Sequence, residues 1–270
     1  MKAKISWFIC SMMFSVTALC APFELKVERI YSPNLLKDPQ FSQSEKNIWI
    51  FANYSNTEGI SWKFSNGILR FNTPGNAYSY MTQPNIPVQE GKRYYVGSTR
   101  RCSSRSLMWV TTPQYHDGKH SQFPPFSDTT IFCVANPPTY KDAPKLLSQF
   151  ISADLLLDYD NWQTLGKEFV VPKGKNITFY DFRIGAYGGI PGWIEFKDPE
   201  FCEAAMEYKI SFESSTPVTI QLLSASGKVR TSRKFDGKPG IQTTSFKVPS
   251  RLEHLKIRIS DAKQQFTTEL

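Results

Sequence analysis

Aromatic and amide side chains between the expected strands are the strongest candidates for ligand chemistry. A flat aromatic ring packs against the apolar C–H face of a sugar, and amide groups hydrogen-bond its hydroxyls. The candidate binding residues are Trp49, Tyr78, Gln83, Tyr115 and Tyr187. Further candidates outside the expected strands are Tyr54, Asn76, Gln114 and Asp117. Packing in a core is favoured for the tryptophans within or beside apolar runs, which are Trp62, Trp109 and Trp162.

Catalytic constellations are weak by comparison. His116 and His120, with Asp117, have a spacing that would align metal ligands on a helix, but Gly118 and nearby prolines indicate a surface loop. No Asp or Glu pair stands out for glycoside hydrolysis, and nothing in the sequence brings a lyase's Tyr, His and Arg together. We therefore expect no catalytic residues.

The N-terminus has the pattern of a signal peptide. A short basic region precedes an apolar run, Ile5 to Leu19, which is too short to span a bilayer comfortably. Small residues precede the expected cleavage site before Ala21, so residues 1–20 are the predicted signal peptide and the mature chain is expected to be secreted. No later run predicts a transmembrane segment.

Cleavage leaves Cys102, Cys133 and Cys202. Because an exported chain permits disulfides and the first two lie in strand-like runs, we expect a Cys102–Cys133 disulfide with Cys202 left over. Cleavage also lowers the formal charge from +8 to about +6, without any block of like charges. This charge fits ordinary solubility or attraction to an acidic polysaccharide or cell surface, and nucleic acid is not an expected partner.

Short strand patterns dominate the chain, and the best helix candidate is 146–157. Residues 111–145 are rich in proline and predict a long loop. After Cys202 the sequence contains about five short strands and few aromatics, which predicts a second, small β-domain over 205–270. The expected strands cover 67–71, 86–88, 93–98, 107–110, 130–134, 167–171, 177–184, 192–196, 208–212, 218–223, 228–230, 243–248 and 255–259.

A five-residue repeat brackets the first of these domains. Lys-Asp-Pro-Gln-Phe at 37–41 returns as Lys-Asp-Pro-Glu-Phe at 197–201. Each copy follows an apolar or alternating run, and proline cannot continue a central strand. We expect the two copies to lie in neighbouring antiparallel strands that close one β-sandwich.

Several motifs in order make residues 31–203 resemble a galactose-binding-like jelly-roll module of the carbohydrate-binding type. The resemblance implies a jelly-roll β-sandwich for this segment. With the small second β-sandwich-like domain indicated by the strands after Cys202, we expect an all-β chain. The motifs are Asn34–Phe41, Trp62 with Gly67-Ile68-Leu69, the run Tyr80, Gln83, Ile86, Val88, Gly91 and Tyr94, and the segment from Trp162 through Val171-Pro172-Lys173-Gly174 to Trp193–Asp198.

The resemblance also implies that Asp38 and Asp198 could hold a structural calcium ion. The chain departs from the usual pattern, because Ser42 replaces an acidic residue and Lys197 replaces one Asp of the usual pair. In the alternative interpretation both Asp side chains cap strand ends through turn hydrogen bonds.

Three functions fit these expectations. The first is a secreted, non-catalytic protein that recognises or tethers a polysaccharide through the jelly-roll module. The second is an extracellular structural or adhesion protein that binds a protein partner. The third is a polysaccharide lyase or hydrolase, for which the sequence offers the least support.

Overall fold

The structure is a computed structural model that describes residues 25–42, 48–53, 58–75, 77–103, 108–116, 121–122, 131–134, 161–174, 177–188 and 191–270. It describes only the backbone at 77–78, 108–116, 121–122, 131–134, 165 and 187–188. The predicted signal peptide and the helix candidate lie outside the described residues.

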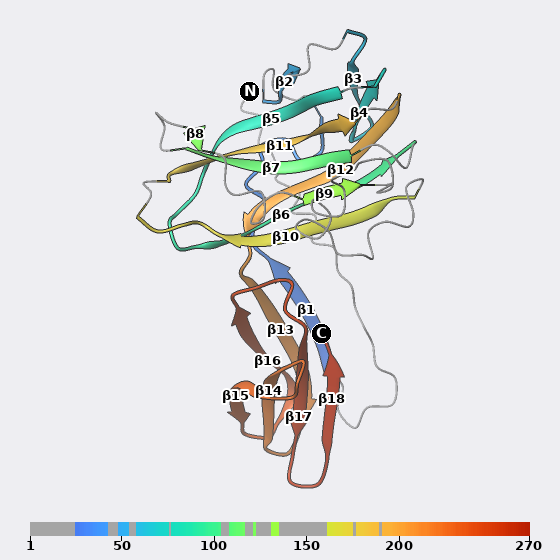
Figure 1. The fold of residues 1–270 in the computed structure, drawn as a ribbon. Coiled ribbons are helices and arrows are strands. Elements are labelled where there is room, and N and C mark those ends of the chain that lie inside the picture. The colour runs from blue at the N-terminus through green and yellow to red at the C-terminus, as the bar shows by residue number, and fades with distance from the viewer. Residues whose placement is uncertain are drawn as a thin grey trace, which may run out of the picture. The chain divides into compact units, whose positions relative to one another are not determined.

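All the regular secondary structure in the described ranges is β-strand, which confirms the all-β prediction (Figure 1). The strands are β1 Leu25–Tyr31, β2 Ile50–Asn53, β3 Ser61–Ser65, β4 Ile68–Thr73, β5 Ala77–Pro87, β6 Arg93–Cys102, β7 Met108–His116, β8 Ser121–Gln122, β9 Ile131–Val134, β10 Gln163–Val170, β11 Phe179–Gly188, β12 Gly192–Glu203, β13 Met206–Ser214, β14 Val218–Ser224, β15 Val229–Phe235, β16 Lys238–Val248, β17 Leu255–Ser260 and β18 Gln265–Glu269. No helix of the described part is long and apolar enough to cross a membrane.

The strands form two compact units. The larger unit is Pro33–Ala204, and the smaller unit joins the described residues up to Ser32 with Ala205–Leu270. β1 belongs to the smaller unit because it pairs with β13 over its whole length. The smaller unit is therefore built from both ends of the chain.

Two sheets make up the larger unit. One, here called the β12 sheet, has the order β10-β6-β12-β4-β3. The other, here called the β11 sheet, has the order β2-β5-β11-β7-β8, and β9 also pairs with β7. The expected β-sandwich is thus confirmed for this unit.

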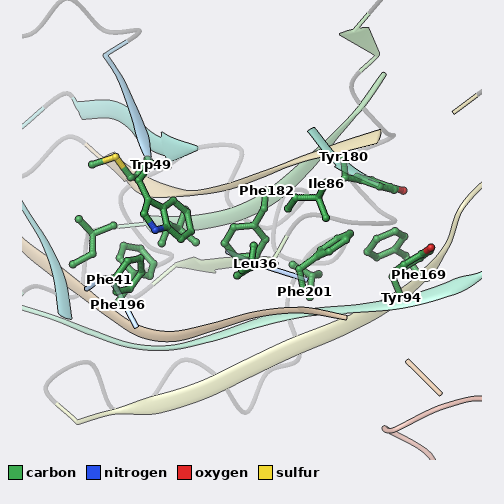
Figure 2. Close-up of a cluster of buried hydrophobic side chains, with 14 of the residues drawn as sticks. Leu36, Phe41, Trp49, Ile86, Tyr94, Phe169, Tyr180, Phe182, Phe196 and Phe201 are labelled. Atoms are coloured by element: carbon green, nitrogen blue, oxygen red, sulfur yellow. The ribbon is translucent and has the colours of Figure 1, made fainter. Parts of the chain in front are cut away.

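The inner faces of the two sheets meet in an aromatic core, which Figure 2 shows. Period-two alternation builds it, as in β4, where Leu69 and Phe71 are fully buried and their neighbours are partly exposed. Phe201 of β12 contacts the rings of Tyr94 and Tyr180 at centroid distances of 5.6 Å each. The β12 and β11 sheets therefore share one continuous core.

The first copy of the repeat does not form a strand. Residues 37–41 turn, whereas 197–201 belong to β12 and contain a register shift against β6. The two segments are nevertheless close, because Leu35 N donates to Phe201 O at 2.7 Å and the Asn34 amide donates to Pro199 O at 2.8 Å. The prediction of two neighbouring strands is therefore wrong for 37–41. This segment forms a turn instead, in which the Asp38 carboxylate accepts from the backbone N–H and the hydroxyl of Ser42.

The smaller unit is a second, small β-sandwich. Its sheets have the orders β1-β13-β16 and β15-β14-β17-β18. Alternating residues of β13, β14 and β17 fill its core, including Ile210, Ile220 and Ile257, all fully buried. This core contains no residue of the larger unit's aromatic core.

The structure does not show the predicted disulfide. Cys102 and Cys202 are both buried as cysteines. Cys133 stands opposite Trp109 in the β9–β7 pairing, but its side chain lies outside the described part. The Cys102–Cys133 bond therefore stays a prediction.

Candidate functional site

The outer face of the β12 sheet carries the best-defined cluster of polar and aromatic side chains in the larger unit. Along β12, Ile194 and Phe196 are fully buried in the core, so the alternate residues Trp193, Glu195 and Lys197 face outward. The cross-strand register places Arg70 of β4 and Arg101 of β6 directly opposite Glu195. We call the surface formed by Trp162, Trp193, Arg70, Arg101, Glu195 and Lys197 the tryptophan face.

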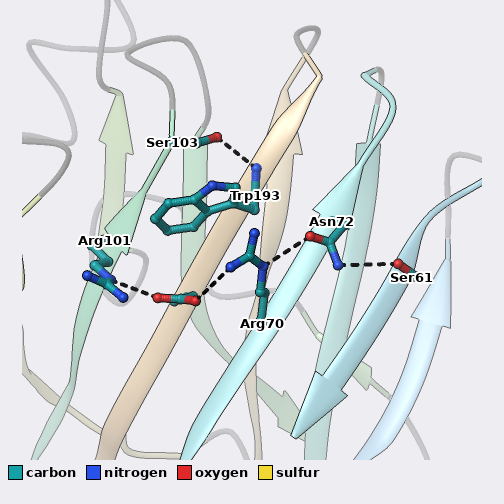
Figure 3. A network of polar contacts seen from close by, with 7 residues as sticks. Ser61, Arg70, Asn72, Arg101, Ser103 and Trp193 are labelled. Carbon is teal, nitrogen blue, oxygen red and sulfur yellow. Dashed lines mark hydrogen bonds and ion pairs between the residues drawn. The ribbon is translucent and has the colours of Figure 1, made fainter. Parts of the chain in front are cut away.

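Glu195 links the two arginines. Its Oε1 accepts from Arg70 Nη1 at 3.1 Å, and its Oε2 accepts from Arg101 Nε at 2.7 Å. The Glu195 side chain is 8% exposed, while those of Arg70 and Arg101 are 41% and 35% exposed. A buried carboxylate thus lies between two partly exposed guanidinium groups and binds both (Figure 3).

The tryptophan rings pack against these cations. Arg70 Cζ lies 4.7 Å from the Trp193 ring centroid, and Arg101 Cζ lies 5.6 Å from it. Arg101 Cζ also lies 4.6 Å from the Trp162 ring, and the Lys197 ammonium lies 4.5 Å from the same ring. Both indoles are partly exposed, and their rings make cation–π contacts on the surface of the sheet.

Short polar side chains continue the network on both sides. Arg70 Nε donates to Asn72 Oδ1 at 3.1 Å, and the Asn72 amide donates to Ser61 Oγ at 3.4 Å (Figure 3). Trp193 N donates to Ser103 Oγ at 2.8 Å. The face therefore combines aromatic rings with donors and acceptors held in fixed positions.

Trp49 is part of the core and was wrongly predicted as a binding residue. It is 8% exposed, and its ring packs against Phe41 and Phe182 with centroid distances of 5.2 and 6.1 Å. The indole N–H donates to Asp38 O at 3.1 Å, which satisfies its only polar group.

Gln83 is also buried and was wrongly predicted as a binding residue. It is 2% exposed, and its Oε1 accepts from Lys37 N at 3.2 Å. This hydrogen bond links the turn at 37–41 to the β11 sheet.

The three predicted tyrosines belong to strands of the β11 sheet, and their side chains lie outside the described part. Tyr78 of β5 and Tyr187 of β11 are direct cross-strand partners. Tyr115 of β7 is opposite Tyr180, seven residues along β11 from Tyr187 and about 23 Å away by strand rise. The loop assignment was wrong, and the register joins Tyr78 with Tyr187 but not with Tyr115.

The ring of Tyr80, two residues along β5 from Tyr78, lies close to this tyrosine pair. Tyr80 of β5 is opposite Gly185, and a Cβ at Gly185 would meet the Tyr80 ring at 2.7 Å. Arg183 Cζ lies 6.0 Å from the same ring. Tyr80 is only 6% exposed, so this ring is not an open platform.

The tryptophan face was missed in the sequence, where Trp162 was assigned to a core and Trp193 only to a strand. That assignment of Trp162 was wrong, and Trp62, also expected in the core, is 40% exposed. One available signal was the alternation Trp-Ile-Glu-Phe-Lys at 193–197, which puts three polar or amphipathic residues on one face.

The described residues give the calcium prediction no support. Asp38 Oδ1 accepts from both the backbone N–H and the hydroxyl of Ser42 at 2.8 Å, which is the turn role considered as the alternative. Asp198 is exposed at the β12 register shift. Within the described ranges, His, Cys, Asp and Glu form no group of three that could hold a metal ion. The site stays a prediction.

Comparison with known proteins finds similar folds only among solved structures. No protein-family profile and no curated protein matches the chain. A structure reported as "CBM4 structure and function" is 13% identical, with a TM-score of 0.41, over 62% of this chain and 99% of that one. TmCBM61 in complex with β-1,4-galactotriose is 12% identical, with a TM-score of 0.38, over 64% and 99%.

A third similar structure is the CBM22-1 xylan-binding domain of Xyn10C from Paenibacillus barcinonensis. It is 9% identical, with a TM-score of 0.39, and covers 64% of this chain and 96% of that one. These structures are of the class that the sequence motifs resemble. Their low identities and TM-scores below 0.5 do not assign this chain to a family.

Proposed function

We propose that the chain is a secreted, non-catalytic protein that binds a polysaccharide through the tryptophan face of its larger unit. The observation that carries the proposal is the pairing of Trp162 and Trp193 with the Arg70–Glu195–Arg101 network on one sheet face. Indole rings match the C–H faces of pyranose rings, and the surrounding guanidinium and amide groups match their hydroxyls.

The geometry favours binding over catalysis. The carboxylate of this face, Glu195, is occupied by two ion pairs and is 8% exposed, so it is poorly placed to attack or protonate a substrate. Glycoside hydrolysis needs two carboxyl groups on either side of the scissile bond. Fixed rings beside fixed hydrogen-bonding groups are what recognition alone requires.

The experiment is titration of the mature chain with a panel of soluble polysaccharides, followed by Trp193→Ala and Trp162→Ala. For a polysaccharide that binds, each substitution should weaken affinity about tenfold, as for an aromatic binding hot spot. Trp62→Ala is the matched control, because Trp62 is a partly exposed tryptophan that packs against Phe51 and Phe64 instead.

Two results would contradict the proposal. One is the absence of binding to any polysaccharide in the panel, which would leave the adhesion or structural alternative. The other is equal loss of affinity in all three variants, which would place the indoles of this face outside the binding site.

A further inference from the structure

The tryptophan face carries a surplus of positive charge. Arg70, Arg101 and Lys197 surround the two indoles, and Lys63, exposed on β3, is the cross-strand partner of Arg70. Glu195 is the only carboxylate in these register rows of the described β12 sheet. The next along β12 on this face, Glu200, is opposite Gly97, four residues from Arg101 along β6 and about 13 Å away.

This surplus is local. In the sequence, residues 33–204 contain 17 Lys or Arg against 16 Asp or Glu, a net charge of +1. Four cations around a single carboxylate therefore reflect the arrangement of this face and not the overall charge of the unit. Clustered like charges repel, so an anionic ligand would relieve repulsion that a neutral one leaves in place.

Glu195 uses only part of what the guanidinium groups offer. Each guanidinium has five N–H donors, and the contacts with Glu195 and Asn72 use two on Arg70 and one on Arg101. With about a third or more of each side chain exposed, the remaining donors can reach a planar or tetrahedral oxyanion in bidentate fashion.

Lys197 adds a third cation to the two arginines. Its ammonium lies over the Trp162 ring and makes no ion pair with any residue that the structure describes. A sugar stacked on Trp162 would bring its substituents within reach of both Lys197 and Arg101.

We infer that the polysaccharide bound by the tryptophan face is acidic, with carboxylate or sulfate groups on rings that stack against Trp162 and Trp193. The inference rests on the proposed function and adds the chemical class of the ligand. The indoles take the C–H faces, Arg70 and Arg101 bind the anionic group, and Lys197 contributes charge.

The test compares chemically matched ligands on the mature chain by calorimetry. Polygalacturonate is compared with highly methyl-esterified pectin, and a sulfated galactan with a neutral galactan, so that carboxylate and sulfate recognition are separated. The acidic member of at least one pair should bind ten or more times tighter than its neutral partner, and rising salt should reduce the difference.

Charge variants locate the effect. Arg70→Gln and Arg101→Gln should each remove most of the preference for the acidic ligand. Lys197→Gln should reduce it by several-fold without disturbing Glu195, so it keeps the test valid if an arginine variant fails to fold. Lys37→Gln, which removes an exposed cation from the turn at 37–41, should leave the preference unchanged.

Equal binding of acidic and neutral partners would overturn the inference while leaving polysaccharide binding intact. Preference that survives Lys197→Gln and both arginine variants would place the anion elsewhere and also overturn it. Absence of binding to every polysaccharide would overturn the inference together with the proposed function.

Discussion

The indole rings of Trp49 and Trp193 lie in opposite environments, one buried in the core and one partly exposed on the sheet surface. Trp49 follows a polar stretch but buries its ring among Phe41 and Phe182. Trp193 opens an apolar run but lies on the outer face, where two guanidinium groups contact it. The hydrogen bond from the Trp49 indole to Asp38 O could not be read from the sequence, because it depends on a turn closed by Ser42.

The Glu195 carboxylate should contribute measurably to stability. Glu195→Ala would leave Arg70 and Arg101 adjacent without their shared anion, so we expect a loss of about 1–3 kcal/mol in the free energy of unfolding. Urea unfolding followed by tryptophan fluorescence measures it.

The control for that substitution is Glu203→Ala. The Lys92–Glu203 ion pair has both side chains 42% exposed, so its removal should change stability far less than Glu195→Ala does. Equal effects of the two substitutions would contradict the structural role given to Glu195.

At the scale of elements, strands with clear alternation were predictable and those with irregular composition were not. The runs within β11, β12, β14 and β17 were all expected, because one of their faces is apolar. For β5, only the end of the strand was predicted. β5 contains Pro84 at the point where its register with β11 shifts. There the side chain of Asp181 accepts from Asn85 N at 3.0 Å in place of a regular ladder bond.

The five-residue repeat shows the limit of local sequence more directly. Its two copies are nearly identical, yet Phe41 has a φ of 49° in one and Asp198 has a φ of 49° in the other. The positive φ falls at different positions of the repeat, so contacts outside it decide the conformation. Asp38 bonds Ser42 in the first copy, while Lys197, Glu200 and Phe201 of the second copy pair with β6.

The turn between β17 and β18 should make the smaller unit sensitive to acid. Asp261 Oδ1 accepts from Lys263 N at 2.7 Å and from Gln264 N at 2.8 Å, and these backbone bonds lower the pKa of Asp261. A lowered folded-state pKa gives stability that is present above the ordinary carboxyl pKa and lost as pH falls through the folded-state value.

Asp261→Asn should therefore destabilise the smaller unit at neutral pH, and its difference from the parent chain should vanish in acid. Urea midpoints followed by circular dichroism between neutral pH and about pH 2 measure the difference, spanning the ordinary Asp value. A difference that stays constant over this range would rule out the charge of Asp261 as the cause.

At the scale of the whole molecule, two units with separate cores divide the chain. The short strand patterns after Cys202 predicted a small β-domain over 205–270. They did not predict that β1 belongs to it. β1 pairs with β13 from the opposite end of the sequence, and pairings of such long separation leave no local pattern. Residues 25–32 and 205–270 contain 13 Lys or Arg against 7 Asp or Glu, a net charge of +6, so the net positive charge is concentrated in the smaller unit and not in the larger one.

Separate cores predict separable unfolding. Ile257→Ala removes a fully buried side chain from the smaller unit and should cost about 2–5 kcal/mol there. In a chain produced without residues 1–20, every tryptophan lies within 33–204, so tryptophan fluorescence reports the larger unit alone. The substitution should shift the transition seen by far-ultraviolet circular dichroism and leave the fluorescence transition in place. A matching shift in fluorescence would show that the two units unfold together.

The most direct test of the central claim is the response of individual indole N–H resonances to a bound polysaccharide. In a nitrogen-15 spectrum of the mature chain, assigned with single Trp→Phe variants, the Trp162 and Trp193 indole signals should shift on titration. The Trp49 signal should stay fixed, because its N–H is buried and bonded to Asp38 O. Binding that leaves both Trp162 and Trp193 unshifted would contradict the tryptophan face as the polysaccharide-binding site.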